Sequence, residues 1–463
     1  MRPLGAQISH MLKDRGVEVI FGIPGVHNQE MYRGIEEAGL THVLARHEQG
    51  AGFMADGYAR ATGRPGVCYV ITGPGLCNIM TPMGQAYSDS VPMVVISSCL
   101  DEVAAKRGQL HQMKDQRAAA DCVADWSHEA RTADAAYQLI DRAFTELQAA
   151  RPRPKHIQVP IATLQGEAAN FPPGMSGDID SQLLPVSSHV ADAAQAILRA
   201  KSPLFVFGGG CVSDTGSAPP EFAYVRDLLQ RSGAAAFTSY AGRGILPPEH
   251  PQNFGSFLGR PSSADIFAKA DLLVVFGSEL SECDLWRNDI GHDCPLIRVD
   301  LEPTVLASGK HTEAQYQQDA LSFITQLAET LPSDVAPKWD LEDISQCRKK
   351  WRAEVDAERP GILPVIDALR SALPAGTMIY SDMTQFAYAA KEAWGYGFAG
   401  SLAPSHGLWH AWVCHARSDW WPDWPPRQAN NGDHWRLRVS IHDARAGCGC
   451  RAKAADPDLF VGQ

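Results

Sequence analysis

Residues 46–60 read Arg-His-Glu-Gln-Gly-Ala-Gly-Phe-Met-Ala-Asp-Gly-Tyr-Ala-Arg, and this stretch decides the predicted fold. It follows a short apolar run, Val43 to Ala45, so Glu48 is expected where a strand passes into a helix. Glycine and alanine at positions 50 to 52 leave room for a planar ligand or a second backbone to approach closely. A glutamate at a helix start is also explained by the helix dipole alone. This segment by itself therefore leaves both interpretations open.

The surrounding sequence, from residue 5 to about 165, alternates strand-like and helical patterns. Apolar, β-branched runs such as Val17–Phe21 and Val67–Thr72 are separated by segments with helical periodicity. A loop over residues 72–75, Thr-Gly-Pro-Gly, follows one such run and opens a helix that carries Asn78. Loops of this kind bind ligands at the carboxyl edge of a parallel sheet. The pattern predicts an α/β domain whose parallel sheet is covered by helices on both faces.

The rest of the chain predicts further α/β units of the same kind. Central strands are expected over residues 204–207, 272–276 and 296–299, and a third unit is expected to contain a helix ending at Leu373 and a strand over 378–381. The predicted ranges are 1–168 for the first domain, 169–188 for a linker, 189–331 for a central Rossmann-like domain, 332–360 for a second linker, 361–400 for the start of a third domain and 401–463 for a tail of different character.

The overall composition excludes several classes of function. The chain has 463 residues, of which 45% are hydrophobic and 20% charged, and its formal net charge is -12. Such a chain is not attracted to a nucleic-acid backbone or an anionic membrane, so neither is expected as a partner. No stretch approaches the ~20 apolar residues of a membrane span, and no signal core is visible, so a cytoplasmic location is expected. The odd number of cysteines, 11, favours reduced thiols, and no metal ligands are predicted.

Segments 21–25, 47–60 and 72–78 together carry a resemblance to a known family. In their order and spacing they resemble the pyrimidine-binding domain of thiamine diphosphate enzymes of the acetolactate synthase group. The amino-acid sequence of residues 25–27 and 46–54 is most similar to that of 5-guanidino-2-oxopentanoate decarboxylases, with acetolactate synthases next. The resemblance extends over residues 1–394. It implies a small 2-oxo acid as substrate, thiamine diphosphate with Mg2+ as cofactors, and a homodimer or homotetramer.

The resemblance also implies roles for individual residues. Glu48 matches the family's catalytic acid, which hydrogen-bonds the pyrimidine ring and lets the cofactor lose its thiazolium proton. Apolar neighbours of this acid are expected at Val26, Phe53 and Met54. The residues expected to bind the cofactor are Gly25, Glu48, Thr72, Gly73, Pro74, Gly75 and Asn78.

Two histidines are expected on the substrate side of the same site. His27 and His111 are candidates for catalytic proton transfer or for orienting the substrate carboxylate, although each one alone is also explained as a structural residue. Gln85 and the pair Asp115-Gln116 are weaker candidates, since they are also explained as partners of backbone groups.

The central domain raises the question of a flavin. Three consecutive glycines, Gly208 to Gly210, follow its first predicted strand. They fit either a tight turn or a close approach to a nucleotide, and some relatives in the family bind FAD there while others bind nothing. FAD binding therefore stays open at the level of sequence.

The tail has a composition unlike the rest of the chain. Residues 402–463 hold six of the 11 tryptophans and show neither helical nor strand periodicity. Tryptophan has the single codon TGG, so a frame read one nucleotide later converts each Trp codon into GGN, which encodes glycine. Trp409 and Trp412 then become glycines at the spacing of the family's Gly-Tyr-Gly-Thr-Leu-Gly run, and residues 434–440 permit Ile-Gly-Asp-Tyr-Gly-Phe-Gln. We infer a frameshift between about Trp394 and Ser401.

Several functions therefore compete at this stage. The first is a thiamine diphosphate-dependent decarboxylase, with an acetolactate synthase-type carboligase as its alternative. A second is an inactive product that lacks the Mg2+ and diphosphate site, because the tail as written predicts no packed domain and no partner for the strand over 378–381. A third, a nucleotide-binding module, rests on Gly208 to Gly210 alone.

Overall fold

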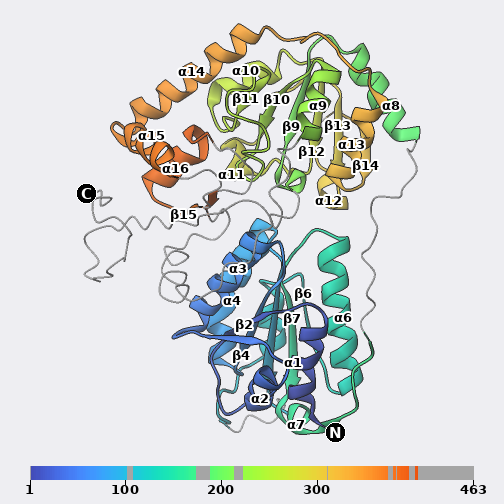
Figure 1. Ribbon diagram of the computed structural model, residues 1–463, viewed down its shortest axis with the longest axis vertical. Coiled ribbons are helices and arrows are strands. Elements are labelled where there is room, and N and C mark those ends of the chain that lie inside the picture. The colour runs from blue at the N-terminus through green and yellow to red at the C-terminus, as the bar shows by residue number, and fades with distance from the viewer. Residues whose placement is uncertain are drawn as a thin grey trace.

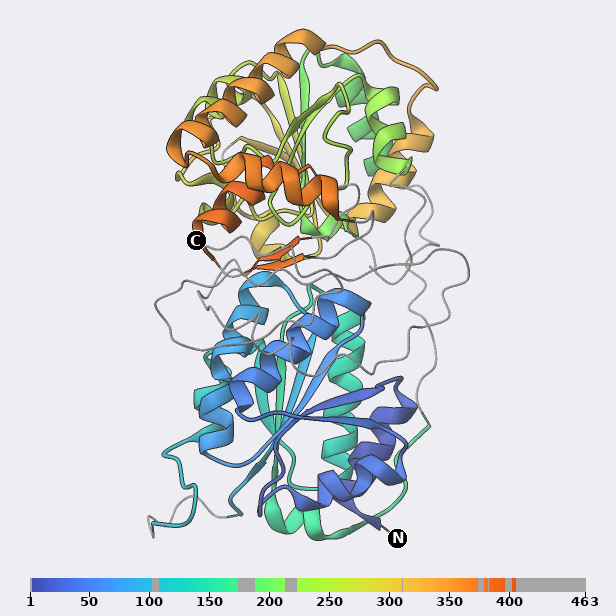
Figure 2. The same cartoon turned by 60° about the vertical axis from the view of Figure 1, so that its left-hand side comes forward.

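The structure is a computed structural model, and it describes residues 2–101, 108–173, 188–212, 223–309, 311–373, 379–381, 383–395 and 402–404. Two α/β units lie one above the other, and the helices that follow the central unit pack against its side (Figures 1 and 2). The predicted succession of α/β domains with parallel sheets is confirmed. Of the predicted tail, residues 401 and 405–463 lie outside the described part of the chain.

The first unit is built on a six-stranded sheet in the order β3-β2-β4-β5-β7-β6, in which every pairing is parallel. The strands are β2 (Val19–Gly22), β3 (Thr41–Leu44), β4 (Gly66–Val70), β5 (Met93–Cys99), β6 (Trp126–Glu129) and β7 (Lys155–Pro160). The helices are α1 (Leu4–Asp14), α2 (Gln29–Glu37), α3 (Glu48–Thr62), α4 (Pro74–Asp89), α5 (Gln116–Asp121), α6 (Ala133–Ala149) and α7 (Ile161–Gln165). A short antiparallel pair, β1 (Arg2–Pro3) with β8 (Glu167–Ala168), joins the two ends of the unit.

Helices cover both faces of this sheet, as the near-continuous apolar strands require. Helices α1, α2 and α6 pack on one face around residues such as Ile20 and Ile96, whereas α3 and α4 pack on the other around Phe21 and Val95. The small residues of α3 serve this packing. A Cβ atom at Gly52 would lie 2.3 Å from Pro82 Cγ of α4, so the close neighbour at this position is another helix.

A fully buried histidine ties three strands of the first sheet together. His156 on β7 lies 2.9 Å from Ser97 Oγ of β5 through Nε2 and 2.6 Å from Ser127 Oγ of β6 through Nδ1. Burial lowers the pKa of His156 to about 3, because a charged imidazolium would lose its hydration there. The folded chain therefore holds a neutral imidazole at this position at any pH near neutrality.

This burial predicts a pH dependence of stability. Between pH 6.5 and about 3 the unfolded chain binds a proton at His156 that the folded chain does not, so the stability that His156 contributes is present above pH 6.5 and is lost as the pH falls. The free energy of unfolding should decrease by about 1.4 kcal/mol per pH unit over this range because of this residue. Urea unfolding of the wild type and His156→Gln from pH 4 to 7 measures it. Equal slopes in the two proteins would contradict the assignment, and His189→Gln, at an exposed residue of the central unit, is the control.

The central unit repeats the architecture with a sheet in the order β11-β10-β9-β12-β13-β14, again parallel throughout. The strands are β9 (Pro203–Phe207), β10 (Ala235–Thr238), β11 (Asn253–Gly255), β12 (Leu272–Phe276), β13 (Leu296–Asp300) and β14 (Thr312–Gln317). The helices are α8 (Ser188–Arg199), α9 (Ala223–Ser232), α10 (Ala264–Phe267), α11 (Glu282–Leu285), α12 (Pro303–Leu306) and α13 (Ala320–Thr330), with short 3-10 turns at Gly209–Cys211 and Pro261–Ser263.

The segment 332–360, predicted as a linker, is corrected by the structure. It contains helix α14 (Leu341–Glu358), which covers one face of the central sheet. Ile344, Trp351 and Val355 are buried, and the Trp351 ring lies 5.8 Å from that of Phe237 on β10. These apolar residues are seven and four positions apart, so they form one narrow helical stripe within a polar sequence. The stripe is too sparse to dominate the composition, which is why the segment resembles a linker.

The beginning of the third unit packs on the same face. It consists of α15 (Ile362–Ala372), β15 (Ile379–Ser381), α16 (Gln385–Ala393) and β16 (Leu402–Pro404). Arg260 of the central unit is paired with Glu358 of α14 and with Glu392 of α16, and it is only 4% exposed. Hydrophobic residues of α15 and α16 join the core around Trp351. Helices α15 and α16 therefore belong physically to the central unit in this chain.

The expectation that strand β15 lacks a partner is wrong. β15 and β16 form a two-stranded parallel sheet in which Ile379 pairs with Leu402 and Ser381 with Pro404. Backbone pairing of this kind needs no particular side-chain pattern, so it was not visible in the composition of the segment. Tyr380 Oη donates a 3.3 Å hydrogen bond to the Gly57 carbonyl of α3, which joins this small sheet to the first unit.

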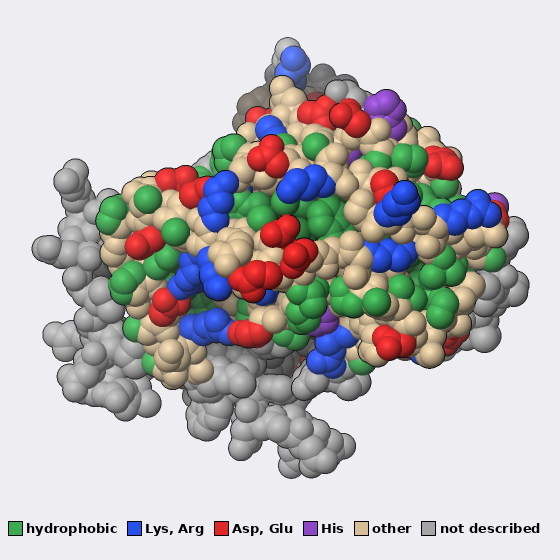
Figure 3. All heavy atoms as spheres, turned by 90° about the horizontal axis from the view of Figure 1, so that it is seen from above, with side chains coloured by type: hydrophobic (Ala, Val, Ile, Leu, Met, Phe, Trp, Pro, Cys, Tyr) green, Lys and Arg blue, Asp and Glu red, His purple; other side chains and the backbone are tan. Residues whose placement is uncertain are grey.

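Charges on the outer face of the central unit are mixed. Acidic and basic side chains lie next to one another across the face seen from above, with hydrophobic side chains between them (Figure 3). Within the described residues, no helix has both the length and the apolar character needed to cross a bilayer.

Candidate active site

The order of the strands places a ligand site at one point of the first sheet. From β2 the chain moves to β3 on one side, and then from β4 it continues on the other side of β2. The loops that follow β2 and β4 therefore diverge at the carboxyl edge and leave a crevice between them, where ligands of open α/β sheets bind. The loop after β2 contains Gly25 and His27, and the loop after β4 contains Thr72 to Gly75.

Glu48 is the first residue of α3 and lies beside this crevice. His47 caps the helix by accepting a 3.2 Å hydrogen bond from the Gln49 N–H, which leaves the Glu48 side chain at the helix start. Asn78 Nδ2 of α4 donates a 2.8 Å hydrogen bond to Glu48 Oε2. Glu48 is 8% exposed, and a Cβ atom at Gly75 would lie 3.4 Å from Oε1. The structure therefore brings three of the residues expected to bind the cofactor, Glu48, Gly75 and Asn78, into contact distance.

Polar side chains of β5 and α5 hold the loop after β4 in place through hydrogen bonds. Thr72 donates hydrogen bonds to Ser98 Oγ of β5 through its backbone N–H at 3.1 Å and its hydroxyl at 2.8 Å. The Gly73 N–H donates to Gln116 Oε1 at 2.8 Å, and Pro74 occupies the first turn of α4, where its missing N–H costs nothing. Gln116, a weak candidate from sequence, thus satisfies a backbone group of the cofactor-binding loop. Ser98 was missed, although a polar pair ending an apolar strand is a visible signal.

Gly73 brings this loop into close contact with the loop that contains His111. Its φ is +70°, and a Cβ atom on it would lie 2.3 Å from the His111 carbonyl oxygen. His111 itself has a φ of +64°, so both sides of this contact have left-handed backbone. Only glycine fits here without displacing His111.

The Gly73→Ala variant should consequently lose stability for two reasons. The left-handed backbone costs an alanine about 1 kcal/mol, and the clash with the His111 carbonyl adds about 1–3 kcal/mol. Gly39→Ala is the matched control, because Gly39 has a φ of +69° but a Cβ atom on it would meet nothing within 4 Å. Chemical denaturation should place Gly73→Ala below Gly39→Ala in unfolding free energy. Equal values for the two variants would show that the contact with His111 is unimportant.

His27 and His111 lie side by side in this region. Their rings are 5.1 Å apart in an edge-to-face arrangement, and the Nδ1 atom of each is buried without a hydrogen-bond partner. Burial and the neighbouring His111 lower the pKa of His27, which favours a neutral imidazole. The structure therefore joins the two predicted histidines into one pair whose polar atoms have unused hydrogen-bonding capacity.

The remaining predicted residues pack against neighbours, lie on the surface or cap a helix. Gly25 packs on Ile71, since a Cβ atom there would lie 2.3 Å from Ile71 Cδ1. Phe53 and Met54 are buried as expected, but Val26 is 57% exposed, so the expected apolar shell is incomplete in this chain alone. Gln85 is buried with its Oε1 unpartnered, and Asp115 caps α5 by accepting from the Ala118 N–H at 2.9 Å.

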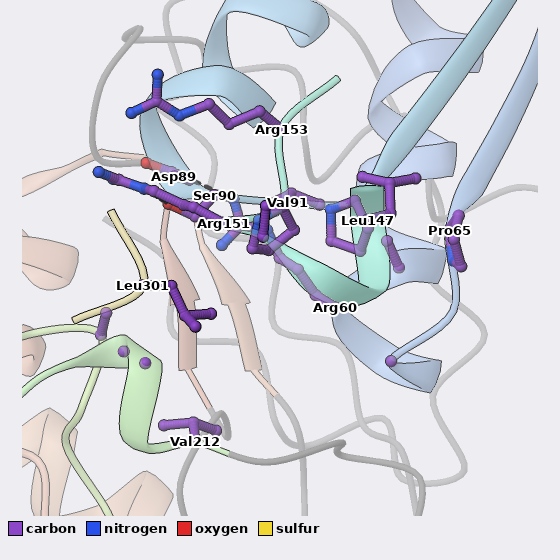
Figure 4. Close-up of a pocket in the computed structure, with 18 of the residues that line it drawn as sticks. Arg60, Pro65, Asp89, Ser90, Val91, Leu147, Arg151, Arg153, Val212 and Leu301 are labelled. Carbon is purple, nitrogen blue, oxygen red and sulfur yellow. Dashed lines mark hydrogen bonds and ion pairs between the residues drawn. The ribbon is translucent and has the colours of Figure 1, made fainter. Parts of the chain in front are cut away.

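A cavity of about 1480 Å³ lies between the first and central units. Arg60, Arg151 and Arg153 line it from the first unit, and Val212 and Leu301 line it from the central unit (Figure 4). Arg151 forms a 2.9 Å ion pair with Glu279, which connects the two units across the cavity.

The glycines that suggested a nucleotide adjoin this cavity but have another explanation. A Cβ atom at Gly208 would lie 2.1 Å from the Gly277 carbonyl oxygen, and one at Gly210 would lie 2.9 Å from Gly277 Cα. The Gly210 N–H also donates a 3.0 Å hydrogen bond to that carbonyl. Close packing between the loops after β9 and β12 therefore accounts for these two glycines.

Two family models match the first and the central units of this chain. The family model for the thiamine pyrophosphate enzyme N-terminal TPP binding domain matches residues 2–119, and the model for the central domain of the same enzymes matches residues 190–327. A protein of Pseudomonas aeruginosa named "Probable 2-ketoarginine decarboxylase" is 37% identical over 406 residues, which cover 86% of this chain and 70% of that protein. The chain belongs to the thiamine pyrophosphate enzyme family.

Other members of the family are more distant and longer. An acetolactate synthase large subunit of Mycobacterium tuberculosis is 30% identical over 334 residues, which cover 70% of this chain and 52% of that subunit. The large subunit of acetolactate synthase isozyme 1 from Escherichia coli is 28% identical over 340 residues, covering 72% and 58%. The chain thus spans only a little more than half the length of these acetolactate synthases. Its first two domains are those of the family, and Glu48, Thr72 to Gly75 and Asn78 lie within the matched N-terminal domain.

Proposed function

We propose that this chain descends from a thiamine diphosphate-dependent decarboxylase of a 2-oxo acid, with 5-guanidino-2-oxopentanoate as the substrate class. Family membership supports the cofactor, and the relative named as a 2-ketoarginine decarboxylase supports the substrate. The observation that carries the proposal is the contact of Glu48 with Asn78 above Gly75, at the crevice between β2 and β4.

The residues present fit a thiamine pyrimidine ring. A Cβ atom at Gly75 would lie 2.8 Å from Ile71 Cγ2 and 3.4 Å from Glu48 Oε1, so glycine here lets the start of α4 pack closely beside the Glu48 carboxyl group. When bound, thiamine diphosphate supplies an electron sink that accepts the electrons released as carbon dioxide leaves. Glu48 would hold a proton against the pyrimidine nitrogen, and the 2.8 Å hydrogen bond from Asn78 fixes the direction of its carboxyl group. Thr72 and Gly73 keep the opposing loop in place through Ser98 and Gln116.

His27 and His111 would serve the substrate side of the site. A neutral imidazole can accept a proton at one ring nitrogen and release the proton of the other, and both rings here have an unpartnered Nδ1. We propose that the pair relays from water the proton that completes decarboxylation. An acetolactate synthase-type carboligase is the alternative, in which a second carbonyl compound reacts in place of this proton. Burial and the neighbouring His111 lower the pKa of His27, which favours the neutral form of His27.

The Mg2+ and diphosphate site belongs to the third domain of the family. Among the described residues, no group of three or more His, Cys, Asp or Glu could hold a metal ion. We propose that a frameshift after about Trp394 has removed this site. The literal chain, meaning the 463-residue chain as its sequence stands, would then bind thiamine diphosphate weakly or be inactive. In that proposal, an in-frame version assembles as a homodimer or homotetramer. A cytoplasmic location stays a prediction.

FAD remains a weaker proposal for the cavity between the units. The volume of about 1480 Å³ is ample for a dinucleotide, but Gly208 and Gly210 are explained by packing on Gly277 and no longer favour a nucleotide. The third candidate function, a nucleotide-binding module, rested on the same glycines and loses its support as well.

Thiamine diphosphate titration of the full 463-residue chain separates the active from the inactive alternative. Tryptophan fluorescence would be followed in the presence of Mg2+, and release of carbon dioxide from 5-guanidino-2-oxopentanoate would be measured in parallel. Binding at micromolar concentration with turnover would show a working enzyme and would contradict loss of the diphosphate site. Undetectable binding by this chain, together with binding by an in-frame version, is the result expected here.

A further inference from the structure

A smaller cavity of about 290 Å³ lies at the carboxyl edge of the first sheet, next to the predicted cofactor loop. Thr72 of that loop, Cys99, Gln116, Glu129 and Gln158 are among the residues that line it. Glu48 is not one of the lining residues, whereas Thr72 belongs to the same loop as Gly75, which lies next to Glu48. We propose that it is the subsite for the side chain of the substrate and that Glu129 recognises a cationic, guanidinium-bearing end. This proposal rests on the proposed function.

A chain of hydrogen bonds connects Glu129 with the cofactor loop. Glu129 Oε2 accepts from Gln158 Nε2 at 2.7 Å, and Gln158 Oε1 accepts from Gln116 Nε2 at 3.2 Å. Gln116 Oε1 in turn accepts from the Gly73 N–H at 2.8 Å. Gln116 and Gln158 are 7% and 3% exposed, so water competes little for these bonds. The acid is thereby held at a fixed position relative to the loop that borders the cofactor.

The structure already shows a guanidinium on this acid. The Nη2 atom of Arg131 lies 2.6 Å from Glu129 Oε1, and the Arg131 side chain is 67% exposed while that of Glu129 is 19% exposed. Oε1 is nevertheless buried without a hydrogen bond of good geometry. An exposed ion pair of this kind contributes little to stability, so a ligand can displace Arg131 at small cost. A planar guanidinium entering from the cavity could contact the carboxylate with two N–H groups.

The lining of the cavity carries charges of both signs, with Lys114, Arg117 and Arg131 against Asp115 and Glu129. Lys114 and Arg117 are exposed, so water and salt screen their charges. Asp115 is committed to the cap of α5. In the interior, burial and the neighbouring Glu129 raise the pKa of the Cys99 thiol, which is therefore uncharged. Of the two acidic residues in the described lining, Glu129 is the less exposed one and does not cap a helix, so it is the acid that this proposal assigns to the ligand.

Ligand binding to the full 463-residue chain tests this subsite without thiamine diphosphate, so that no turnover occurs. Saturation-transfer NMR titrations would compare 5-guanidino-2-oxopentanoate with 2-oxopentanoate, which lacks the guanidinium, and with 2-oxoglutarate, which carries a second carboxylate. Glu129→Gln should weaken binding of the guanidino acid about tenfold or more and leave 2-oxopentanoate unchanged, because it removes one charge-assisted contact. Arg131→Ala should strengthen binding of the guanidino acid about threefold, because it removes the resident competitor.

Glu18→Gln is the matched control, because Glu18 also has a 2.6 Å pair with an arginine, Arg64, but precedes β2 at the opposite edge of the sheet. Its binding should equal that of the wild type. The subsite is overturned if the wild type does not bind the guanidino acid, if it prefers 2-oxoglutarate, or if Glu129→Gln weakens both 2-oxopentanoate and the guanidino acid equally. If Glu129→Gln does not fold, an unchanged affinity in Arg131→Ala overturns it as well. A chain that shows the Glu129-dependent preference but whose in-frame version never binds thiamine diphosphate would support the subsite and contradict the proposed function.

Discussion

Replacing Glu48 by glutamine in an in-frame version of this protein should lower the rate of decarboxylation by about three powers of ten. Glutamine keeps the shape of the side chain and can still accept the hydrogen bond that Asn78 donates at 2.8 Å to the native carboxyl. It cannot exchange a proton with the pyrimidine nitrogen, so the cofactor would not be activated. The loss should appear in kcat and not only in KM, because it concerns a step after binding.

Circular dichroism and the unfolding midpoint provide the structural control for Glu48→Gln. Both should remain close to the parent, because Glu48 lies at a helix start that His47 continues to cap through the Gln49 N–H. Glu30→Gln offers a second control, since Glu30 is a glutamate in the first turn of α2 that pairs with Arg33 at 2.6 Å. A Glu48→Gln enzyme within about threefold of the parent rate would remove Glu48 from the mechanism.

Restoring the reading frame after Trp394 should raise the affinity for thiamine diphosphate by at least about two powers of ten. The diphosphate and its Mg2+ carry most of the charge of this cofactor, and oxygen ligands for them are expected only in the restored third domain. The restored protein should also form a dimer or tetramer, as the resemblance to the family implies. Isothermal calorimetry and light scattering on the two proteins measure both effects.

Two large apolar residues next to the histidines are exposed in this chain. Val26 is 57% and Leu110 is 60% exposed, although both flank the histidine pair. The nucleotide sequence over codons 390 to 402 is the direct control, since it shows whether an insertion or deletion is present. A clean dimer of the literal chain with micromolar cofactor affinity would contradict the frameshift.

Much of the fold was predictable because strands and helices alternate at short intervals. The apolar runs over 67–72 and 272–276 are continuous and each is followed by glycine, which is typical of strands buried on both faces. The cofactor-binding loop was visible for the same reason, since Thr72 to Gly75 directly follows such a run. Glu48 was ambiguous by itself, and only its spacing from the other two motifs indicated a role.

The remaining features depend on contacts between segments that are distant in sequence. Helix α14 resembled a linker because its burial depends on a narrow stripe around Trp351, whose partners lie on the central sheet. The role of Gln116 depends on Gly73, which is 43 residues away in the chain. Glu129 carries no motif at all, and its position beside the cofactor loop follows from the order β5-β7-β6 in the sheet.

The central claim is that the Glu48 carboxyl activates thiamine diphosphate, and the exchange of the thiazolium C2 proton with deuterium measures this directly. The measurement needs no substrate. It therefore depends neither on the assignment of the side-chain subsite nor on whether the enzyme is a decarboxylase or a carboligase. With the cofactor bound to the in-frame protein, exchange should be about two powers of ten faster than in its Glu48→Gln variant at equal occupancy. Equal exchange rates in the two proteins would contradict the account.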